Sequence, residues 1–349
     1  MGNVKIIREE LKPEHQVFIS EMGARKKGDI REICDFVEPH IGIITSIGEQ
    51  HLETFKTLQN VANTKAELLK GSGSRSRTAN YYDSIIGMTK SMINLAKETV
   101  KKENKEGYNK VLDEGAVFLL KDGEYCEDLF KKDNHKNKYS FAVDDTGASY
   151  YAKNIKTSVE GSEFTVVSPV YHEYNCKTKL LGKHNVQNIV GAIAIAEFLG
   201  LTKDEIKDGV EKIEPVEHRL QLLPSTNGTT VIDDAFNSNP IGSKCALDVI
   251  KEFPGRKIII TPGMVELGEK EDALNKDFGR QMASAVDIAI LVGPNHTKPI
   301  QEGLRARDFD DMNIYVVKDL NEATEKLQKL SMPGDVILFE NDLPDSYNE

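Results

Sequence analysis

Three polar side chains near the start of the chain have the chemistry of a cation site: the carboxylate of Glu21, the imidazole of His51 and the amine of Lys65. Glu21 ends the apolar run 17–19, and His51 follows the apolar run 41–47. Both runs predict β-strands, so Glu21 and His51 are expected just beyond strand C-termini, the edge at which open α/β sheets bind ligands. The pattern therefore predicts a cation site that serves a nucleotide.

Composition and charge exclude several classes of protein. The chain has 349 residues, of which 39% are hydrophobic and 29% are charged, and this length favours two domains. No apolar run is long enough to span a bilayer, so membrane insertion is not expected. The formal net charge of −11 argues against a general nucleic-acid binder, which needs a basic face. Small anionic molecules remain possible partners if a metal ion and local basic residues offset the negative electrostatic field of the protein.

Cysteine usage and the N-terminal residues indicate the cytoplasm. The four cysteines lie far apart, without a Cys-x-x-Cys pair, and are Cys34, Cys126, Cys176 and Cys245. This spacing is typical of reduced structural thiols and not of a zinc site or a disulfide framework. Residues 1–13 are mixed and polar, without the apolar segment of a secretory signal. We therefore expect a cytoplasmic protein.

The first part of the chain alternates strand-like and helix-like patterns. The expected order is a strand at 17–20, a helix at 28–37, a strand at 41–47 and a helix at 58–70. Such a βαβα order predicts a parallel sheet. Residues 71–110 interrupt it and are expected to form a surface insertion with one amphipathic helix, 89–103. Short strands are expected across 115–182, followed by a helix at 185–199 that ends at Gly200.

A second unit begins near Glu214-Pro215. Five strands are expected in it, at 230–233, 257–261, 288–292, 314–317 and 335–339, with helical segments between most successive pairs. This pattern predicts a doubly wound α/β domain of ordinary size.

Seven motifs occur in an order that is similar to that of a known family. They are Glu21-Met-Gly-Ala-Arg-Lys-Lys-Gly-Asp-Ile, Gly48-x-x-His51-Leu-Glu, Thr64-Lys65-x-Glu67, Leu181-Gly-Lys-His-Asn185-x-x-Asn188, Glu217-His-Arg219-Leu-Gln, Asp233-Asp-Ala-Phe-Asn-Ser-Asn-Pro240 and Gly263-Met-Val-Glu-Leu-Gly268. In these motifs the chain resembles the Mur ligases, in particular the type that adds D-alanyl-D-alanine to UDP-N-acetylmuramoyl tripeptide. The resemblance implies an α/β fold with a central ATPase-like domain, 1–214, and a C-terminal doubly wound, Rossmann-like domain, 215–349. The central domain would be incomplete and would carry the insertion at about 71–110.

The chain departs from the family pattern in two places. The family carries a UDP-sugar domain and then a Gly-x-x-Gly-Lys-Thr phosphate loop upstream of the segment at which this sequence begins, and neither is expected here. Residues 72–78 look like a damaged phosphate loop, with Ser76 in the position of the last glycine and Arg77 in place of the lysine. A flexible loop rich in glycine, serine and arginine is the alternative interpretation.

The resemblance implies a magnesium site. Glu21 and His51 would hold the ion, and Lys65 would be carbamylated to provide a third, negatively charged oxygen ligand. Judged by residue type alone, histidine is an unusual magnesium ligand, and a helix lysine is most often a solvated surface residue. The residue types alone therefore do not decide whether His51 binds a metal ion or whether Lys65 is a surface residue.

The resemblance also implies a set of nucleotide contacts: Asn185, Asn188, Arg219, Asp233, Asn237 and Asn239. Each has a structural alternative. The first two open a helix and could serve as caps, Arg219 could form an interdomain salt bridge, and Asn237 or Asn239 could cap the next helix. The loop 263–268 would help to shape the dipeptide pocket, although a plain tight turn explains its glycines as well.

The activity that the resemblance implies is ATP-dependent amide ligation. A carboxylate of UDP-N-acetylmuramoyl tripeptide would be activated as an acyl phosphate, and the amine of D-alanyl-D-alanine would then displace phosphate. Lys65, Arg219 and His51 would be the catalytic residues, with ATP and Mg²⁺ as the nucleotide and the metal ion. The alternatives are a catalytically impaired relic or nucleotide-binding module of the same fold, and a related ligase with another amine acceptor.

Overall fold

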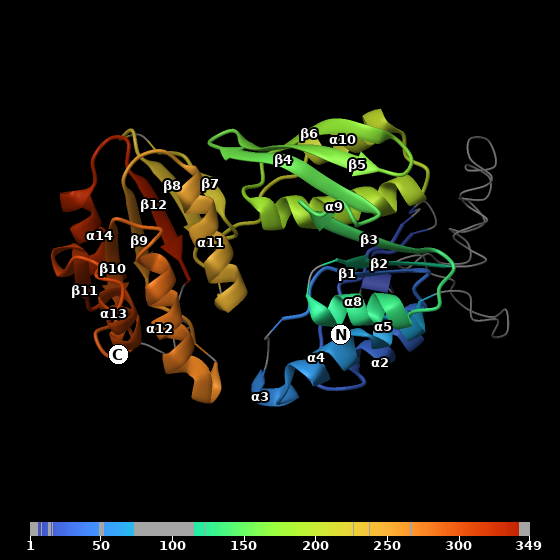
Figure 1. Cartoon of the computed structure of the whole chain (residues 1–349), viewed down its shortest axis with the longest axis horizontal. Helices are drawn as coiled ribbons and strands as arrows, with labels where there is room; N and C mark the ends of the chain where they lie inside the picture. The colour runs from blue at the N-terminus through green and yellow to red at the C-terminus, as the bar shows by residue number, and fades with distance from the viewer. Residues whose placement is uncertain are drawn as a thin grey trace.

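Two sheets organise the chain. The computed structural model describes residues 6–7, 9–12, 15, 17–48, 52–72, 115–121, 123–225, 227–236, 238–265 and 267–341. Within these residues, two six-stranded sheets have the strand orders β1-β2-β3-β4-β5-β6 and β11-β10-β9-β12-β8-β7 (Figure 1). Helices pack on both, so the expected α/β class is confirmed. None of the described helices combines the length and the hydropathy that crossing a bilayer requires.

The first sheet is parallel at one end and antiparallel at the other. Its strands are β1 (Ile41–Ile44), β2 (Ala116–Leu120), β3 (Lys138–Val143), β4 (Tyr150–Ser158), β5 (Gly161–Ser168) and β6 (His172–Thr178). Strands β1 to β4 pair in parallel, and β5 pairs antiparallel with β4 and β6. Every residue of β2 is buried, as expected for a parallel strand covered on both faces. In β6 buried and exposed residues alternate, as in a sheet with one solvated face.

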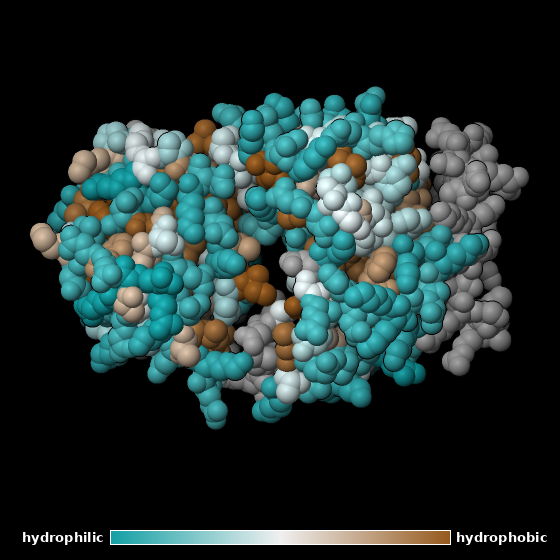
Figure 2. Space-filling view, viewed as in Figure 1, coloured by the Kyte–Doolittle hydropathy of each residue, from teal (hydrophilic) through white to brown (hydrophobic). Residues whose placement is uncertain are grey.

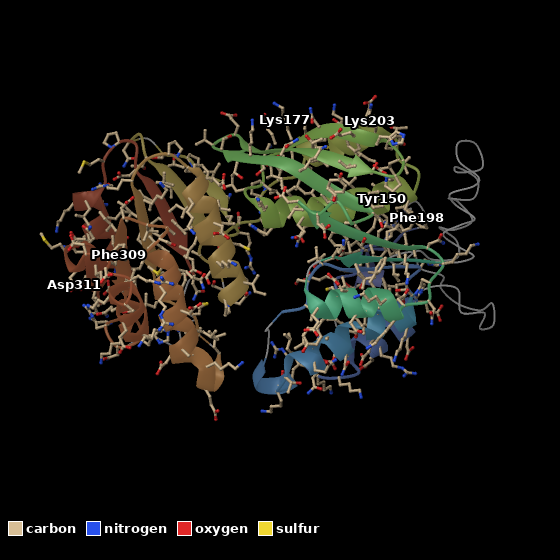
Figure 3. All side chains as sticks on the ribbon, viewed as in Figure 1. Tyr150, Lys177, Phe198, Lys203, Phe309 and Asp311 are labelled. Carbon is tan, nitrogen blue, oxygen red and sulfur yellow. The ribbon has the colours of Figure 1, made fainter. Side chains whose placement is uncertain are left out.

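In the part of the chain that the structure describes, seven helices accompany this sheet. They are α2 (Asp29–Val37), α3 (Leu52–Phe55), α4 (Leu58–Lys65), α5 (Glu67–Gly71), α8 (Glu124–Lys132), α9 (Lys183–Phe198) and α10 (Lys203–Glu211). The sheet curves around α9, which contacts β2, β3, β4 and β5 (Figure 1). Phe198 of α9 meets Phe118 and Tyr139 with ring centroids 5.8 Å apart in both pairs. Figure 3 shows Phe198 and Tyr150 inside this half, whereas Lys177 and Lys203 lie on its outer surface. The aromatic contacts fix α9, whose N-terminus carries several predicted site residues.

Several predictions for the first half were wrong in detail. Residues 17–20 form no strand: Phe18 is buried, but Val17 and Ile19 are 42% and 78% exposed. A strand needs a neighbour to satisfy its backbone, and an apolar run does not supply one. The expected helix 58–70 is divided into α4 and α5 at Ala66, and the strand that begins at Ile41 ends at Ile44.

Three helices among the described residues of the first half were not predicted: the four-residue α3, and the longer α8 and α10. Helix α8 begins after Gly123, and α10 begins with a capping box in which Thr202 and Glu205 exchange hydrogen bonds. Helices α8 and α10 are each nine residues long, so each offers few turns over which a helical pattern can be recognised in the sequence. The predicted helix at 185–199 corresponds to α9, whereas the predicted helix at 89–103 lies outside the described residues.

The second sheet contains all five predicted strands. They are β8 (Thr230–Asp234), β9 (Lys257–Thr261), β10 (Ile288–Val292), β11 (Ile314–Val317) and β12 (Val336–Glu340), all parallel. The unpredicted β7 (Gln221–Leu223) pairs antiparallel with β8 at the edge. The accompanying helices are α11 (Pro240–Glu252), α12 (Glu271–Met282), α13 (Lys298–Arg305) and α14 (Leu320–Leu330), with short 3-10 turns η1 (Gly268–Lys270) and η2 (Asp311–Asn313).

Alternate side chains of the central strands pack on opposite faces of this sheet. Ile259 packs with residues of α11 and α12, whereas Ile258 and Ile260 pack with Ala323 and Leu327 of α14. Two separate cores, one on each face, make this the doubly wound arrangement that the sequence predicts.

The two halves meet at α11, which contacts α9 and β4. The approach is close, because a Cβ built on Gly182 would lie 2.4 Å from Cγ2 of Val249. The predicted boundary near residue 214 lies in the link between α10 and β7 and stays a prediction.

Helices α12 and α13 pack so closely that a side chain cannot be added between them. A Cβ on Gly303 would lie 2.0 Å from the carbonyl oxygen of Lys276, whereas a Cβ on Gly242 in α11 would meet only ordinary contacts, at 3.7 Å or more. We expect Gly303→Ala to lower the free energy of unfolding of this half by about 2 kcal/mol or more, because backbone must move. The matched Gly242→Ala should raise it, by up to about 1 kcal/mol, through lower unfolded-chain entropy. Urea unfolding monitored on the second half measures the free energy of unfolding of both variants. Equal changes for Gly303→Ala and Gly242→Ala would contradict the close packing of α12 and α13.

Candidate functional site

Polar side chains gather where the parallel strands of the second sheet end. Asp233 and Asp234 end β8, Thr261 ends β9, and Glu340 ends β12. Strand β12 lies between β8 and β9, with Glu340 directly opposite Asp234 in the strand register. The C-terminal edge of such a sheet is the usual place for a ligand site. The structure therefore places Asp233 where the sequence predicts it.

Both aspartates hold the loop that carries His218 and Arg219. The Nδ1 atom of His218 lies 2.8 Å from Oδ2 of Asp233, and the backbone N–H of Leu220 donates to Oδ1 of Asp234 at 3.0 Å. His218 and Leu220 have φ angles of 59° and 47°, in the left-handed region that non-glycine residues rarely adopt. Such a backbone persists only where surrounding contacts determine it, and the two carboxyl groups provide those contacts.

Arg219 lies over an aromatic ring in this loop arrangement. Its guanidinium carbon is 4.2 Å from the centroid of Phe236, and the side chain is exposed. A guanidinium stacked on a ring keeps its N–H groups in the plane, directed outward to an anion. Phe236 was not predicted as a site residue, although it belongs to the motif that begins at Asp233.

The pKa of Asp234 is raised to about 6. Burial is the main cause, and the like charge of Asp233 adds to it, whereas the hydrogen bond from Leu220 and the charge of Arg219 act in the opposite direction. Desolvation disfavours the ionised carboxyl, so Asp234 takes up a proton at a higher pH than an exposed aspartate does.

Asn239 acts as a helix cap. Its Oδ1 accepts hydrogen bonds from the backbone N–H groups of Ile241 at 3.1 Å and Gly242 at 3.0 Å. Asp233 also serves its own loop, because Oδ1 accepts from the N–H of Ala235 at 3.0 Å. The structural alternative for Asn239 is thus observed, and it does not exclude a ligand contact. Asn237 lies outside the described residues.

In the first half, Lys65 is largely removed from water at the end of α4. Its Nζ donates to the carbonyl oxygen of Ser46 at 2.8 Å, and burial lowers the pKa of its amine. Ser46 belongs to the segment after β1, and a Cβ on Gly48 in that segment would lie 2.6 Å from Cδ1 of Ile241. Lys65 is therefore connected, through the segment that leads toward His51, to the start of α11 in the other half.

Of the three predicted metal ligands, the structure describes Glu21 and Lys65. His51 lies outside the described residues, and Glu21 is exposed in a segment without regular structure. Among the residues that the structure describes, no three His, Cys, Asp or Glu side chains are grouped so that they could hold a metal ion. The convergence of Glu21, His51 and Lys65 stays a prediction.

The N-terminus of α9 carries the predicted asparagines. Asn185 donates from Nδ2 to the carbonyl oxygen of Leu181 at 2.9 Å, which is a local contact to the backbone before the helix and not a helix cap, and Asn188 is exposed. His184 beside them is half-buried, and the loss of water around its ring lowers its pKa to about 4, which leaves the imidazole neutral at pH 7. Lys183 forms an ion pair with Asp144 at 2.7 Å.

Figure 2 shows a hollow between the two halves of the molecule, with hydrophobic surface at its edge. A different cavity, of about 1120 Å³, is lined by residues of α2, α4, α5 and α8 and by the segment that follows α8, which includes His135. None of the predicted site residues lines that cavity. The strand ends and helix N-termini, and not this cavity, are therefore the candidate site.

Comparison with known proteins matches both halves of the chain. Residues 1–109 and 95–196 match the Mur ligase middle domain, and residues 218–340 match the Mur ligase, glutamate ligase domain. UDP-N-acetylmuramoyl-tripeptide–D-alanyl-D-alanine ligase of Haemophilus influenzae is 28% identical over 309 residues, which are 88% of this chain and 57% of that protein. The ligase of the same name from Bacillus subtilis is 23% identical over 335 residues, 94% of this chain and 62% of that protein.

Two solved structures share the fold. MurF from Acinetobacter baumannii has a TM-score of 0.74 at 21% identity, over 95% of this chain and 63% of that chain. MurF ligase from Thermotoga maritima, solved in complex with ADP, has a TM-score of 0.70 at 19% identity, over 92% of this chain and 63% of that chain. The chain thus spans little more than half the length of the relatives that it matches.

Asp234 should make the stability of the second half depend on pH. Its folded pKa, about 6, exceeds the ordinary value of 3.8, so its contribution is fully present below pH 3.8 and is lost as the pH rises through 6. We expect the free energy of unfolding of the unsubstituted chain to fall by about 2 kcal/mol relative to Asp234→Asn between pH 4 and 7.5. Urea unfolding at several pH values measures this difference.

Asp248→Asn is the control, because Asp248 is an exposed carboxyl on α11. A difference between the original chain and Asp234→Asn that did not change with pH would contradict the raised pKa.

Proposed function

The chain belongs to the Mur ligase family, and from this premise we propose that it is an ATP-dependent amide ligase of peptidoglycan precursor synthesis. We propose that it joins D-alanyl-D-alanine to UDP-N-acetylmuramoyl tripeptide, as the names of its relatives at 23–28% identity state for those proteins. The observation that supports this most is the meeting of the two halves. The segment after β1 accepts a hydrogen bond from Lys65 and also contacts the start of α11. Helix α11 follows the two aspartates of β8 and Phe236, on whose ring Arg219 stacks.

The proposed reaction has two steps. A carboxylate oxygen of the tripeptide attacks the γ-phosphorus of ATP, which forms an acyl phosphate and releases ADP. The amine nitrogen of D-alanyl-D-alanine then attacks the acyl carbon, loses a proton and displaces inorganic phosphate, which leaves an amide. Negative charge accumulates on the phosphoryl oxygens in the first step and on the acyl oxygen in the second, so the protein must supply positive charge and position.

Arg219 provides positive charge in this proposal. The ring of Phe236 supports one face of the guanidinium, and Asp234 draws the loop of Arg219 toward the strand end. Arg219 would therefore reach a transferring phosphoryl group with little loss of side-chain freedom. His218, held by Asp233, fixes the same loop from the other side.

The N-terminus of α9 provides a second contact for phosphate. Its first N–H groups carry partial positive charge, and the helix is sixteen residues long. The exposed amide of Asn188 and the amide of Asn185 lie on its first turns. His184 is neutral at pH 7 and adds no charge of its own, so the backbone dipoles set the field there. Asp233, Asn237 and Asn239 complete the proposed nucleotide contacts from the second half.

Glu21, His51 and a carbamylated Lys65 would hold Mg²⁺, which when bound would supply positive charge to the phosphate oxygens. The lowered pKa of Lys65 is consistent with carbamylation. Carbamate formation requires a neutral amine, which attacks carbon dioxide and releases a proton, and burial increases the neutral fraction by lowering the pKa of Lys65. The product carries its negative charge on oxygen, the ligand atom that magnesium prefers.

A direct assay tests the proposed activity. The chain is incubated with ATP, Mg²⁺, UDP-N-acetylmuramoyl tripeptide and D-alanyl-D-alanine, and phosphate release and product mass are followed. We expect phosphate release that depends on the dipeptide, and a product heavier than the tripeptide substrate by the dipeptide less one water. Nucleotide binding without dipeptide-dependent phosphate would favour a nucleotide-binding module instead.

The same assay compares the turnover of a Lys65 variant with that of a variant at a nearby lysine. We expect Lys65→Ala to reduce turnover at least a hundredfold, because both charge and position are lost. Lys70→Ala changes an exposed lysine on the adjacent helix and should leave turnover unchanged. With ¹³C-labelled bicarbonate, a carbamate signal should be present in the original chain and absent from Lys65→Ala. Equal turnover of the two variants would remove Lys65 from the mechanism.

A further inference from the structure

Glu340, which was not predicted as a site residue, lies fully buried beside two loops of the candidate site. Glu340 has no exposed surface, and both of its oxygens accept hydrogen bonds from hydroxyl groups. Ser238 donates from Oγ to Oε1 at 2.5 Å, and Thr261 donates from Oγ1 to Oε2 at 2.8 Å. Ser238 belongs to the aspartate loop, which we define as the described residues 235–236 and 238–239, and Thr261 precedes the glycine loop, the described residues 262–265 and 267.

The next residue, Asn341, also connects the aspartate loop with the glycine loop, through its side-chain amide. Asn341 donates from Nδ2 to the carbonyl oxygen of Gly263, and its Oδ1 accepts from the N–H of Ser238 at 3.0 Å. Its backbone N–H donates to the carbonyl oxygen of Asp234 at 3.1 Å. Asn341 has a φ of 63°, a left-handed conformation that asparagine tolerates better than most residues. Two successive side chains therefore bridge the same two loops.

Stability alone does not account for a carboxyl group at this position. Removing a carboxylate from water is costly, and replacing buried polar groups by apolar residues of similar volume is often neutral or stabilising. The rest of β12 is apolar, with Val336, Ile337 and Leu338 all buried. A carboxyl at the end of that strand serves a purpose that an apolar side chain cannot, which is to accept one hydrogen bond from the aspartate loop and one from the end of β9, where the glycine loop begins.

The protonation of Glu340 makes the two bonds depend on each other. Burial raises its pKa to about 7, the hydroxyl groups of Ser238 and Thr261 act to lower it, and the nearby charge of Asp234 raises it further. Two donors favour the ionised form. Loss of one donor therefore favours proton uptake, and a protonated carboxyl no longer accepts at both oxygens. The remaining loop is then affected although its own residues are unchanged.

We propose that Glu340 is a positioning residue that couples the aspartate loop to the glycine loop and holds them at one spacing. This inference rests on the proposed function for its consequence: the first loop would contact the nucleotide, and the second would shape the site of the incoming amine. The coupling itself depends only on the contacts between the described residues.

Hydrogen–deuterium exchange of the full chain without nucleotide tests the coupling. Thr261→Val removes the donor beside the glycine loop, and we expect it to raise exchange severalfold in the aspartate loop. Ser238→Ala should likewise raise exchange in the glycine loop, and Glu340→Gln should raise it in both. Thr261→Ser retains the hydroxyl group and is the matched control, which should leave the aspartate loop unchanged.

Two results would overturn the proposal. In one, each hydroxyl variant changes exchange in its own loop only. In the other, exchange rises equally in β10 and β11, far along the sheet, which is the sign of general destabilisation. Ser238→Ala alters a partly exposed loop residue, so it keeps the test decisive if Thr261→Val does not fold.

The consequence for function is measured separately. In the ligase assay, Glu340→Gln should raise the KM for D-alanyl-D-alanine severalfold more than the KM for ATP. If the chain shows the cross-loop exchange effect but no dipeptide-dependent phosphate release, the proposed function fails and the coupling stands. If the chain is an active ligase and the cross-loop effect is absent, the coupling fails and the proposed function stands.

Discussion

Carboxyl groups at the ends of parallel strands are removed from water, and the hydrogen bonds that satisfy them determine the shape of the candidate site. Asp233 and Asp234 hold the loop of His218 and Arg219, and Glu340 holds the loops on either side of it. A buried acid without partners would be costly, so each acid requires specific donors at specific places. The loops are therefore ordered by the acids that they cover, and the sheet positions those acids at one edge.

The same constraint relates the two halves of the molecule. Lys65 is half-buried, and its amine donates a hydrogen bond to a carbonyl oxygen of the segment after β1. That segment lies against the first residues of α11, whose N-terminus is capped by Asn239. Successive contacts thus connect Lys65 of the first half with the capped start of α11 in the second, and the proposed function places the nucleotide where the halves meet.

The sequence predicted the second sheet well because its strands are short apolar runs separated by clear helical segments. It failed at residues 17–20, where Val17 and Ile19 are exposed, because a run of apolar residues does not show whether a neighbouring strand exists. Within the site, the family resemblance implied Asp233 and Arg219 but did not indicate the ring of Phe236 next to the guanidinium. Glu340 carries the same signal as Asp233, a polar residue that ends an apolar run, and could have been found by it. Its two hydroxyl partners lie 102 and 79 residues away in the chain, which spacing cannot reveal.

The central claim is that both halves contact one nucleotide. A crystal structure of the chain with ADP and Mg²⁺ tests it most directly. The account predicts phosphate oxygens within hydrogen-bonding distance of the Arg219 guanidinium and of the first N–H groups of α9. ADP bound in the cavity lined by α2, α5 and α8, or bound to one half without contact to the other, would contradict it.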